Sequence, residues 1–197
     1  MKRRKMLLAL ILMLALSFGA TSSARAESPA PQQEELTRAQ KRKVRKQLEA
    51  IQDSVDYAQA VQALNDRNFI LAADQLVFKR GGTAFVTNTT NFVSLTNNDE
   101  AVVQIAPFNS GGPNGVGGIT VEGKASSVKI EKDRQGTTLF TMTVTGVGIS
   151  AMVTISLPEG TNRASLLVES IYRSQRITLN GRLVPYDRRQ VVQGASL

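Results

Sequence analysis

Acidic side chains are the main candidates for acid–base chemistry in this sequence, because it contains no histidine and no cysteine. It therefore lacks the commonest general base, the thiolate nucleophile and the usual zinc ligands. A pair of carboxylates can serve a glycosidase, and carboxylate oxygens can hold calcium, but no D-x-D-x-D spacing is present. We expect surface solvation, and no catalytic, metal or cofactor site, for the candidates Asp99, Glu100, Glu122, Glu131 and Asp133.

Two glycine-containing motifs begin like functional sequences and then depart from them. Gly112 and Gly117 have the spacing of a phosphate-binding loop, but Gly118 and Ile119 stand where lysine and a hydroxyl residue are required. A strand-like segment follows, so the helix start that would bind phosphate is missing. Ser150 lies in "GVGISAM", which lacks the last glycine of the G-x-S-x-G motif. Both motifs therefore predict structural roles.

Residues 106–118 are predicted to form a long loop between two strands, in which glycines permit positive φ angles. Long loops often carry binding function, so this loop is a candidate ligand lid or partner contact. The candidate contact residues are Pro107, Phe108, Asn109, Pro113 and Asn114.

A basic cluster lies in the segment 38–46, formed by Arg38, Lys41, Arg42, Lys43, Arg45 and Lys46. Residues 27–66 hold seven acids against these six bases, and Arg45 and Glu49 are spaced for an i,i+4 ion pair. The pattern favours a solvated helix face. Envelope phosphates such as lipopolysaccharide head groups are the alternative partner, since an exported protein rarely meets nucleic acid.

Residues 1–26 have the layout of a secretory signal peptide, with cleavage expected after Ala26. A basic start at 2–5 precedes an apolar run at 6–20, which as a helix spans only about 22 Å, short of the ~30 Å hydrocarbon core. No cysteine is available for a lipid anchor. We expect an exported protein of a Gram-negative bacterium, periplasmic or extracellular.

Removing this leader changes the charge of the chain. The whole sequence carries 24 basic and 16 acidic residues, a net charge of +8, but five bases and no acid lie in residues 1–26. The remaining chain has a net charge of +3, which gives no reason to expect nucleic-acid binding. No later segment approaches 18 apolar residues, so no transmembrane helix is expected, and without disulfides the stability must come from a hydrophobic core.

The rest of the chain divides into four parts. Residues 27–33 contain two prolines and predict a flexible spacer. Apolar residues at mostly three- and four-residue spacing predict a helix over 34–66, and none of these positions is glycine or proline. Residues 67–186 predict a β domain, and 187–197 a loose tail.

Beyond Asn68 the apolar residues alternate with polar ones, as in "TLFTMTVTG" and "QRITLNGRL". Such alternation indicates antiparallel sheets with one buried face. We expect a mainly β (α+β) fold, in which the N-terminal helix packs on an antiparallel β-sandwich or partly open β-barrel of about 8–10 strands.

Residues 60–186 resemble the secreted bacterial family catalogued as domain of unknown function 4251. The likeness rests on "ALNDRNFILAA", on a Pro107-Phe108-x-x-Gly111 turn, on a "GGI" restart at 117–119 and on "ASLLVESIYRSQRITLNGRL". This chain departs from the family by having Ala-Pro-Phe before the glycine turn where Leu-Pro-Tyr is usual. The resemblance implies a fold and export, but no activity.

Three functions are compatible with these features. The first is a non-catalytic periplasmic binding or scaffold protein, for a small apolar ligand held between helix and sheet or for an envelope protein. The second is a carboxylate-dependent hydrolase of envelope glycans, which needs two acids about 5 to 10 Å apart in a cleft. The third is an inhibitor or partner subunit that presents the loop 106–118.

Overall fold

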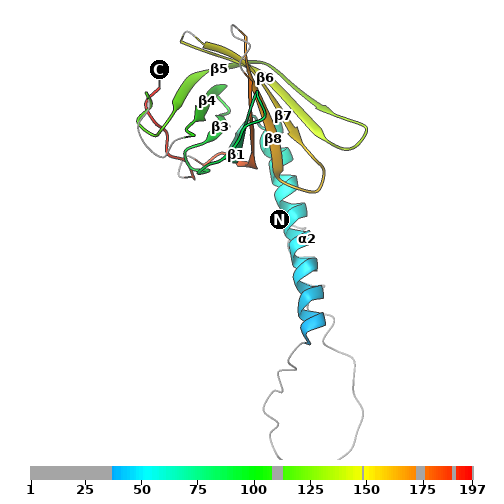
Figure 1. Cartoon of the computed structure of the whole chain (residues 1–197). Helices are drawn as coiled ribbons and strands as arrows, with labels where there is room; N and C mark the ends of the chain where they lie inside the picture. The colour runs from blue at the N-terminus through cyan, green and yellow to red at the C-terminus, as the bar shows by residue number, and fades with distance from the viewer. Residues whose placement is uncertain (1–36, 108–112, 148, 172–175, 188–189, 197) are drawn as a thin grey trace, which may run out of the picture. The chain divides into compact units, whose positions relative to one another are not determined.

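The computed structural model describes residues 37–107, 113–147, 149–171, 176–187 and 190–196. Residues 1–33, predicted as leader and spacer, lie outside them. In these ranges one helix is followed by nine strands (Figure 1), with these bounds: α2 Arg38–Asn65, β1 Phe69–Phe78, β2 Thr83–Phe85, β3 Phe92–Leu95, β4 Glu100–Ile105, β5 Ile119–Lys132, β6 Thr138–Gly146, β7 Ile149–Leu157, β8 Arg163–Ser170 and β9 Arg176–Pro185.

The helix α2 ends where the backbone turns left-handed at Arg67, whose φ is 52°. The amide of Asn68 donates to the carbonyl of Ala63, and that of Arg67 to the carbonyl of Leu64. These two bonds satisfy carbonyls that the end of a helix would otherwise leave free. The polypeptide thereby turns directly from the helix into β1, without a linker.

The strands form an eight-stranded barrel that is closed by pairing between β1 and β9. Neighbours in sequence pair antiparallel from β3 to β9, and β1 pairs with β3 on one edge and with β9 on the other. The short strand β2 pairs with β1 beyond the end of β3. The expected mainly β fold with an N-terminal helix is confirmed. Of the two architectures expected, the barrel is present, and it is closed because β9 reaches β1.

Inward-facing residues of the eight barrel strands build the core. Phe69 and Phe140 meet edge to face, with ring centroids 5.3 Å apart, a favourable aromatic arrangement. The last turns of α2 join this core through Ala60, Ala63 and Leu64, all buried. Because β1 begins just after α2, the helix fills the end of the barrel where β1 starts.

Gly181 occupies the position on β9 where the closing strands approach most closely. The register of the β1–β9 pair shifts between Ala73 and Gln75, a β-bulge. A Cβ atom at Gly181 would overlap the carbonyl oxygen of Ala72 and come within 2.6 Å of the Cα atom of Ala73. Only glycine therefore fits here without displacing β1.

We predict that Gly181→Ala lowers the free energy of unfolding by about 1–3 kcal/mol, because the added methyl group forces the two closing strands apart. Urea denaturation followed by circular dichroism measures the loss. Gly82→Ala is the matched control: its methyl group would meet only Phe78, at 3.7 Å, so a change within about 0.5 kcal/mol is expected. Equal stability of the two variants would contradict the role of Gly181.

Candidate functional site

Each of the five candidate carboxylates has a polar partner in the structure. Asp99 lies 3.4 Å from a guanidinium nitrogen of Arg67, and Glu131 lies 2.6 Å from Nζ of Lys129. A carboxylate oxygen of Asp133 accepts hydrogen bonds of 2.8 Å from two backbone amides of its turn. These contacts explain the acids as turn and surface residues. No group of acids that could hold a metal ion occurs in the described ranges.

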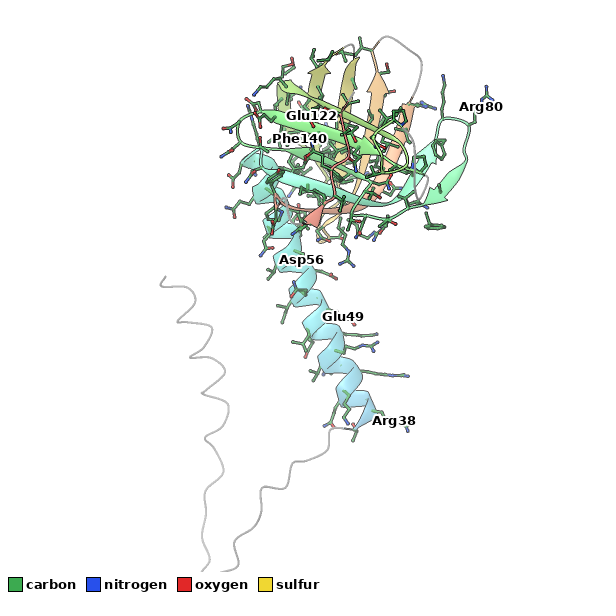
Figure 2. The ribbon with its side chains drawn as sticks, turned by 90° about the vertical axis from the view of Figure 1, so that its left-hand side faces the viewer. Arg38, Glu49, Asp56, Arg80, Glu122 and Phe140 are labelled. Atoms are coloured by element: carbon green, nitrogen blue, oxygen red, sulfur yellow. The ribbon has the colours of Figure 1, made fainter. Side chains whose placement is uncertain are left out.

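Glu100 and Glu122 line one groove of about 620 Å³ on the outer face of β4, β5 and β6. Glu100 pairs with Lys124 at 3.6 Å, and its side chain is 62% exposed. Glu122 accepts a hydrogen bond from Gln193 and is exposed (Figure 2). Both side chains are therefore solvent-exposed and engaged with other polar groups.

Other residues that the sequence suggested are also placed. Ser150 is buried on β7, and no histidine exists in the chain to activate it. Phe108 and Asn109 lie outside the described residues.

The described ends of the loop 106–118 are fixed by buried asparagines. Asn91 donates to the carbonyl of Ala106 at 3.0 Å and accepts from its amide at 2.7 Å. Asn114 is 2% exposed, and its side-chain oxygen accepts from the amides of Val116 and Gly118. The strand expected after the glycines is present as β5.

Of the candidate contacts, Asn114 is thus occupied with holding the loop together. Pro107 is half-buried and lines a groove of about 300 Å³ together with Val116, whereas Pro113 is exposed. Contact of this loop with a ligand or partner stays a prediction.

The segment 190–196, which we call the C-terminal strap, crosses the outer face of β3, β4 and β5. Gln104, fully buried, donates from Nε2 to the carbonyls of Thr90 and Val192 and accepts at Oε1 from Thr120 and the amide of Gly194. The prediction of a loose tail was therefore wrong for these residues. The amphipathic pattern missed the strap because its contacts are made mainly by backbone groups.

A cavity of about 530 Å³ opens at the end of the barrel opposite α2. Its wall comes from the last residues of β1, β4, β6 and β8 and the first residues of β5, β7 and β9, which meet at one end because the strands are antiparallel. Inward apolar side chains form most of it: Phe78, Val103, Ile105, Ile119, Val121, Val144, Ala151, Val168 and Ile177. Ser170 adds one hydroxyl group, and Lys79, Arg80 and Arg176 add positive charge.

The charged side chains that line this cavity are basic. Figure 2 shows Arg80 at the tip of the β1–β2 hairpin, with its side chain pointing away from the barrel. Within the described part of the chain no carboxylate makes an ion pair with Arg80 or Arg176. Glu169 is the cross-strand neighbour of Arg176, and no acid among the residues that the structure describes lines the cavity itself. The cavity therefore combines apolar walls with a cationic rim.

The sequence did not locate this cavity. Alternation indicated which residues point inward, but not which end of the barrel their side chains leave unfilled. The available signal was size: the helix end holds Phe69, Phe140 and Leu157, whereas the cavity end holds mainly valine, isoleucine and alanine. An apolar ligand was expected between helix and sheet, but Ala60 and Leu64 are fully buried there, so that junction is filled.

The basic cluster 38–46 lies on the first turns of α2, where all its side chains are exposed. Arg45 pairs with Glu49 at 3.2 Å, as the i,i+4 spacing predicted. The helix face that carries the basic cluster is therefore exposed to solvent. None of the cluster residues lines the cavity. No helix in the described part of the chain is long and apolar enough to cross a membrane.

A closed eight-stranded barrel with an apolar cavity at one end has the architecture of the small barrels that can hold a single ligand. Residues 52–183 match the family DUF4251, a domain of unknown function, and the chain belongs to this family. The expected resemblance over about 60–186 is thereby confirmed.

A crystal structure of a DUF4251 family protein from Bacteroides eggerthii is similar to this chain. The two share 41% sequence identity and superpose with a TM-score of 0.59, over 69% of this chain and 91% of the other. A comparison with curated proteins gave no match.

We predict that Gln104→Leu lowers the free energy of unfolding by about 2–3 kcal/mol, because the strap loses two hydrogen bonds and the buried hydroxyl group of Thr120 loses its acceptor. Urea denaturation measures this loss, and increased proteolysis within 190–196 would show that the strap has detached. Gln193→Ala serves as the control, since it removes only an exposed hydrogen bond. Undiminished stability of Gln104→Leu would show that the strap contributes little.

Proposed function

We propose that this protein binds a small amphiphilic molecule, with an apolar portion inside the barrel and an anionic group at the rim. The observation that carries the proposal is the cavity of about 530 Å³ at the end opposite α2. Cavities of about 300–1,000 Å³ with mainly apolar walls and a few polar groups are typical of small-molecule sites.

The apolar part of the site supports a hydrocarbon chain or ring system. Val103, Val144 and Val168 point into the cavity from three different strands, and transfer of apolar surface from water to such walls is favourable by about 25 cal/mol per Å². Among the described residues, Ser170 is the one hydroxyl group on the lining. The walls thus favour a ligand with few hydrogen-bonding groups in its buried part.

The rim supports a negative charge at the other end of the ligand. Arg176 presents a guanidinium group, which binds carboxylate or phosphate through several N–H donors. It is exposed, so its attraction is screened by salt and adds selectivity more than affinity. A fatty-acid-like carboxylate and a lipid phosphate share this chemistry.

Export is part of this proposal. The leader-like residues 1–26 support it, and a barrel outside the cytoplasm would meet envelope amphiphiles. We expect the protein, expressed from its full reading frame and purified, to begin at Glu27, and mass spectrometry of the intact protein measures this. A mass that includes Met1 would contradict export through this leader.

The other functions have less support. For a hydrolase, Glu100 and Glu122 share a groove but are solvated and paired with other groups. For a partner subunit, the described ends of the loop 106–118 are held within the fold. Binding in the cavity is therefore the function that the geometry supports best.

We predict that dansylated undecanoic acid binds one site per chain, and that Ala151→Phe weakens binding at least about tenfold by filling the cavity. Fluorescence titration measures the affinity. Met152→Phe is the matched control, because this neighbouring residue is 46% exposed on the outer face. Absence of binding, or equal binding by Ala151→Phe and the unchanged protein, would contradict the proposal.

The same titration distinguishes the two parts of the site. Arg176→Gln should weaken the anionic probe about fivefold while leaving its neutral methyl ester unaffected, and added salt should reduce this difference. Arg182→Gln, an exposed position nearer the opposite end of β9, should change neither affinity. Equal losses for acid and ester would mean that Arg176 has no charge-specific role.

A further inference from the structure

The helix α2 carries an exposed apolar stripe that the cavity does not use. It consists of Val44, Leu48, Ile51 and Val55, whose exposed fractions are 42%, 61%, 61% and 46%. Their spacings of four, three and four residues place them on one helix face, in the pattern of the seam of a coiled coil. Within the described residues no other element covers them.

The stripe lies on the opposite face of α2 from the residues that join the barrel. Ala60 and Leu64 are buried in the barrel core, with Tyr57 and Val61 packed against it. At 100° per residue, the centres of the two faces differ by about 160° around the helix axis. Ala58 and Gln62, on the same face as the stripe, stay exposed beside the barrel. A second helix can therefore lie along the stripe without displacing the barrel to which α2 belongs.

The charges of α2 are separated along its length. The segment 38–47 holds six bases and no acid, whereas 48–65 holds Glu49, Asp53 and Asp56 and no base. Within the helix this order is the reverse of the one that the helix dipole favours. A partner with the opposite order of charges would neutralise both halves, and the partner that has this order is the same helix running antiparallel.

We propose that two copies of this chain associate through an antiparallel pairing of their α2 helices along this stripe. The stripe is self-complementary about its midpoint: Val44 lies level with Val55 of the second copy, and Leu48 with its Ile51. Such matching of a surface with itself is the requirement for a two-fold dimer.

The residues around the stripe agree with this arrangement. Gln47, Gln52 and Ser54 flank the stripe, together with Arg45, which pairs with Glu49 of its own helix at 3.2 Å. A parallel pair would instead set the six bases of one helix against the six of the other.

This pairing is independent of the cavity, which lies at the far end of the barrel. A contact built on four apolar residues per copy falls in the size class of weak interfaces, which bury less than about 1,200 Å² in total. The dimer is therefore concentration-dependent.

Sedimentation velocity over a range of concentrations tests the association, with protein purified after expression of the full reading frame. We expect a monomer–dimer equilibrium in which Leu48→Glu raises the dissociation constant at least about tenfold. Ala50→Glu adds the same charge at an exposed position off the stripe and should leave the constant unchanged. Circular dichroism confirms that both variants are folded.

Cysteine cross-linking tests the orientation, because the chain has no cysteine of its own. In the antiparallel pair, a mixture of Val44→Cys and Val55→Cys forms a disulfide-linked dimer, whereas Val44→Cys alone does not, since its two copies lie about 16 Å apart along the axis. Cross-linking of Val44→Cys alone would indicate a parallel pair and overturn the proposal.

Two other results would also overturn it. One is a monomer at all concentrations. The other is a monomer that binds vesicles of phosphatidylglycerol and phosphatidylcholine through Leu48, which would make the stripe a lipid contact.

Discussion

The pairing of β1 with β9 is the constraint on which the rest of the molecule depends. It joins Phe69–Phe78 to the last strand of the chain through nine residue pairs and converts a meander with two free edges into a closed barrel. Closure leaves no long unpaired edge between these strands and encloses the apolar face of every strand. The bulge at Ala73 and the absence of a side chain at Gly181 allow the two backbones to come this close.

Closure also gives the barrel two ends with different contents. At one end the helix α2 contributes Ala60, Ala63 and Leu64 to a dry core with Phe69 and Phe140. At the other end, smaller inward side chains leave a cavity bordered by arginines. One end therefore supplies stability, and the other supplies space for a ligand. Between the two ends, the C-terminal strap is held on the outer wall of the barrel by Gln104, a buried residue of β4.

The sequence predicted those features that repeat along the chain. The switch from helical to alternating spacing near Asn68 located α2 and the strands, and the alternation in β9 correctly placed Leu179 and Leu183 inside. It could not show that β9 returns to β1, because pairing between distant strands leaves no periodic signal. The cavity was missed for a similar reason, since its wall gathers residues from seven strands. The strap was missed because backbone groups make most of its contacts.

The Gln104 contacts have a consequence for how a nascent chain reaches this structure. Gln104 binds Val192 and Gly194, which lie 88 and 90 residues later in the sequence. The strands β1 and β9, which close the barrel, are also far apart in the sequence. Neither contact can form until β9 and the strap have been synthesised. Because such distant contacts slow folding, we expect neighbouring strands to pair first, and closure of the barrel and docking of the strap to be the late steps of folding.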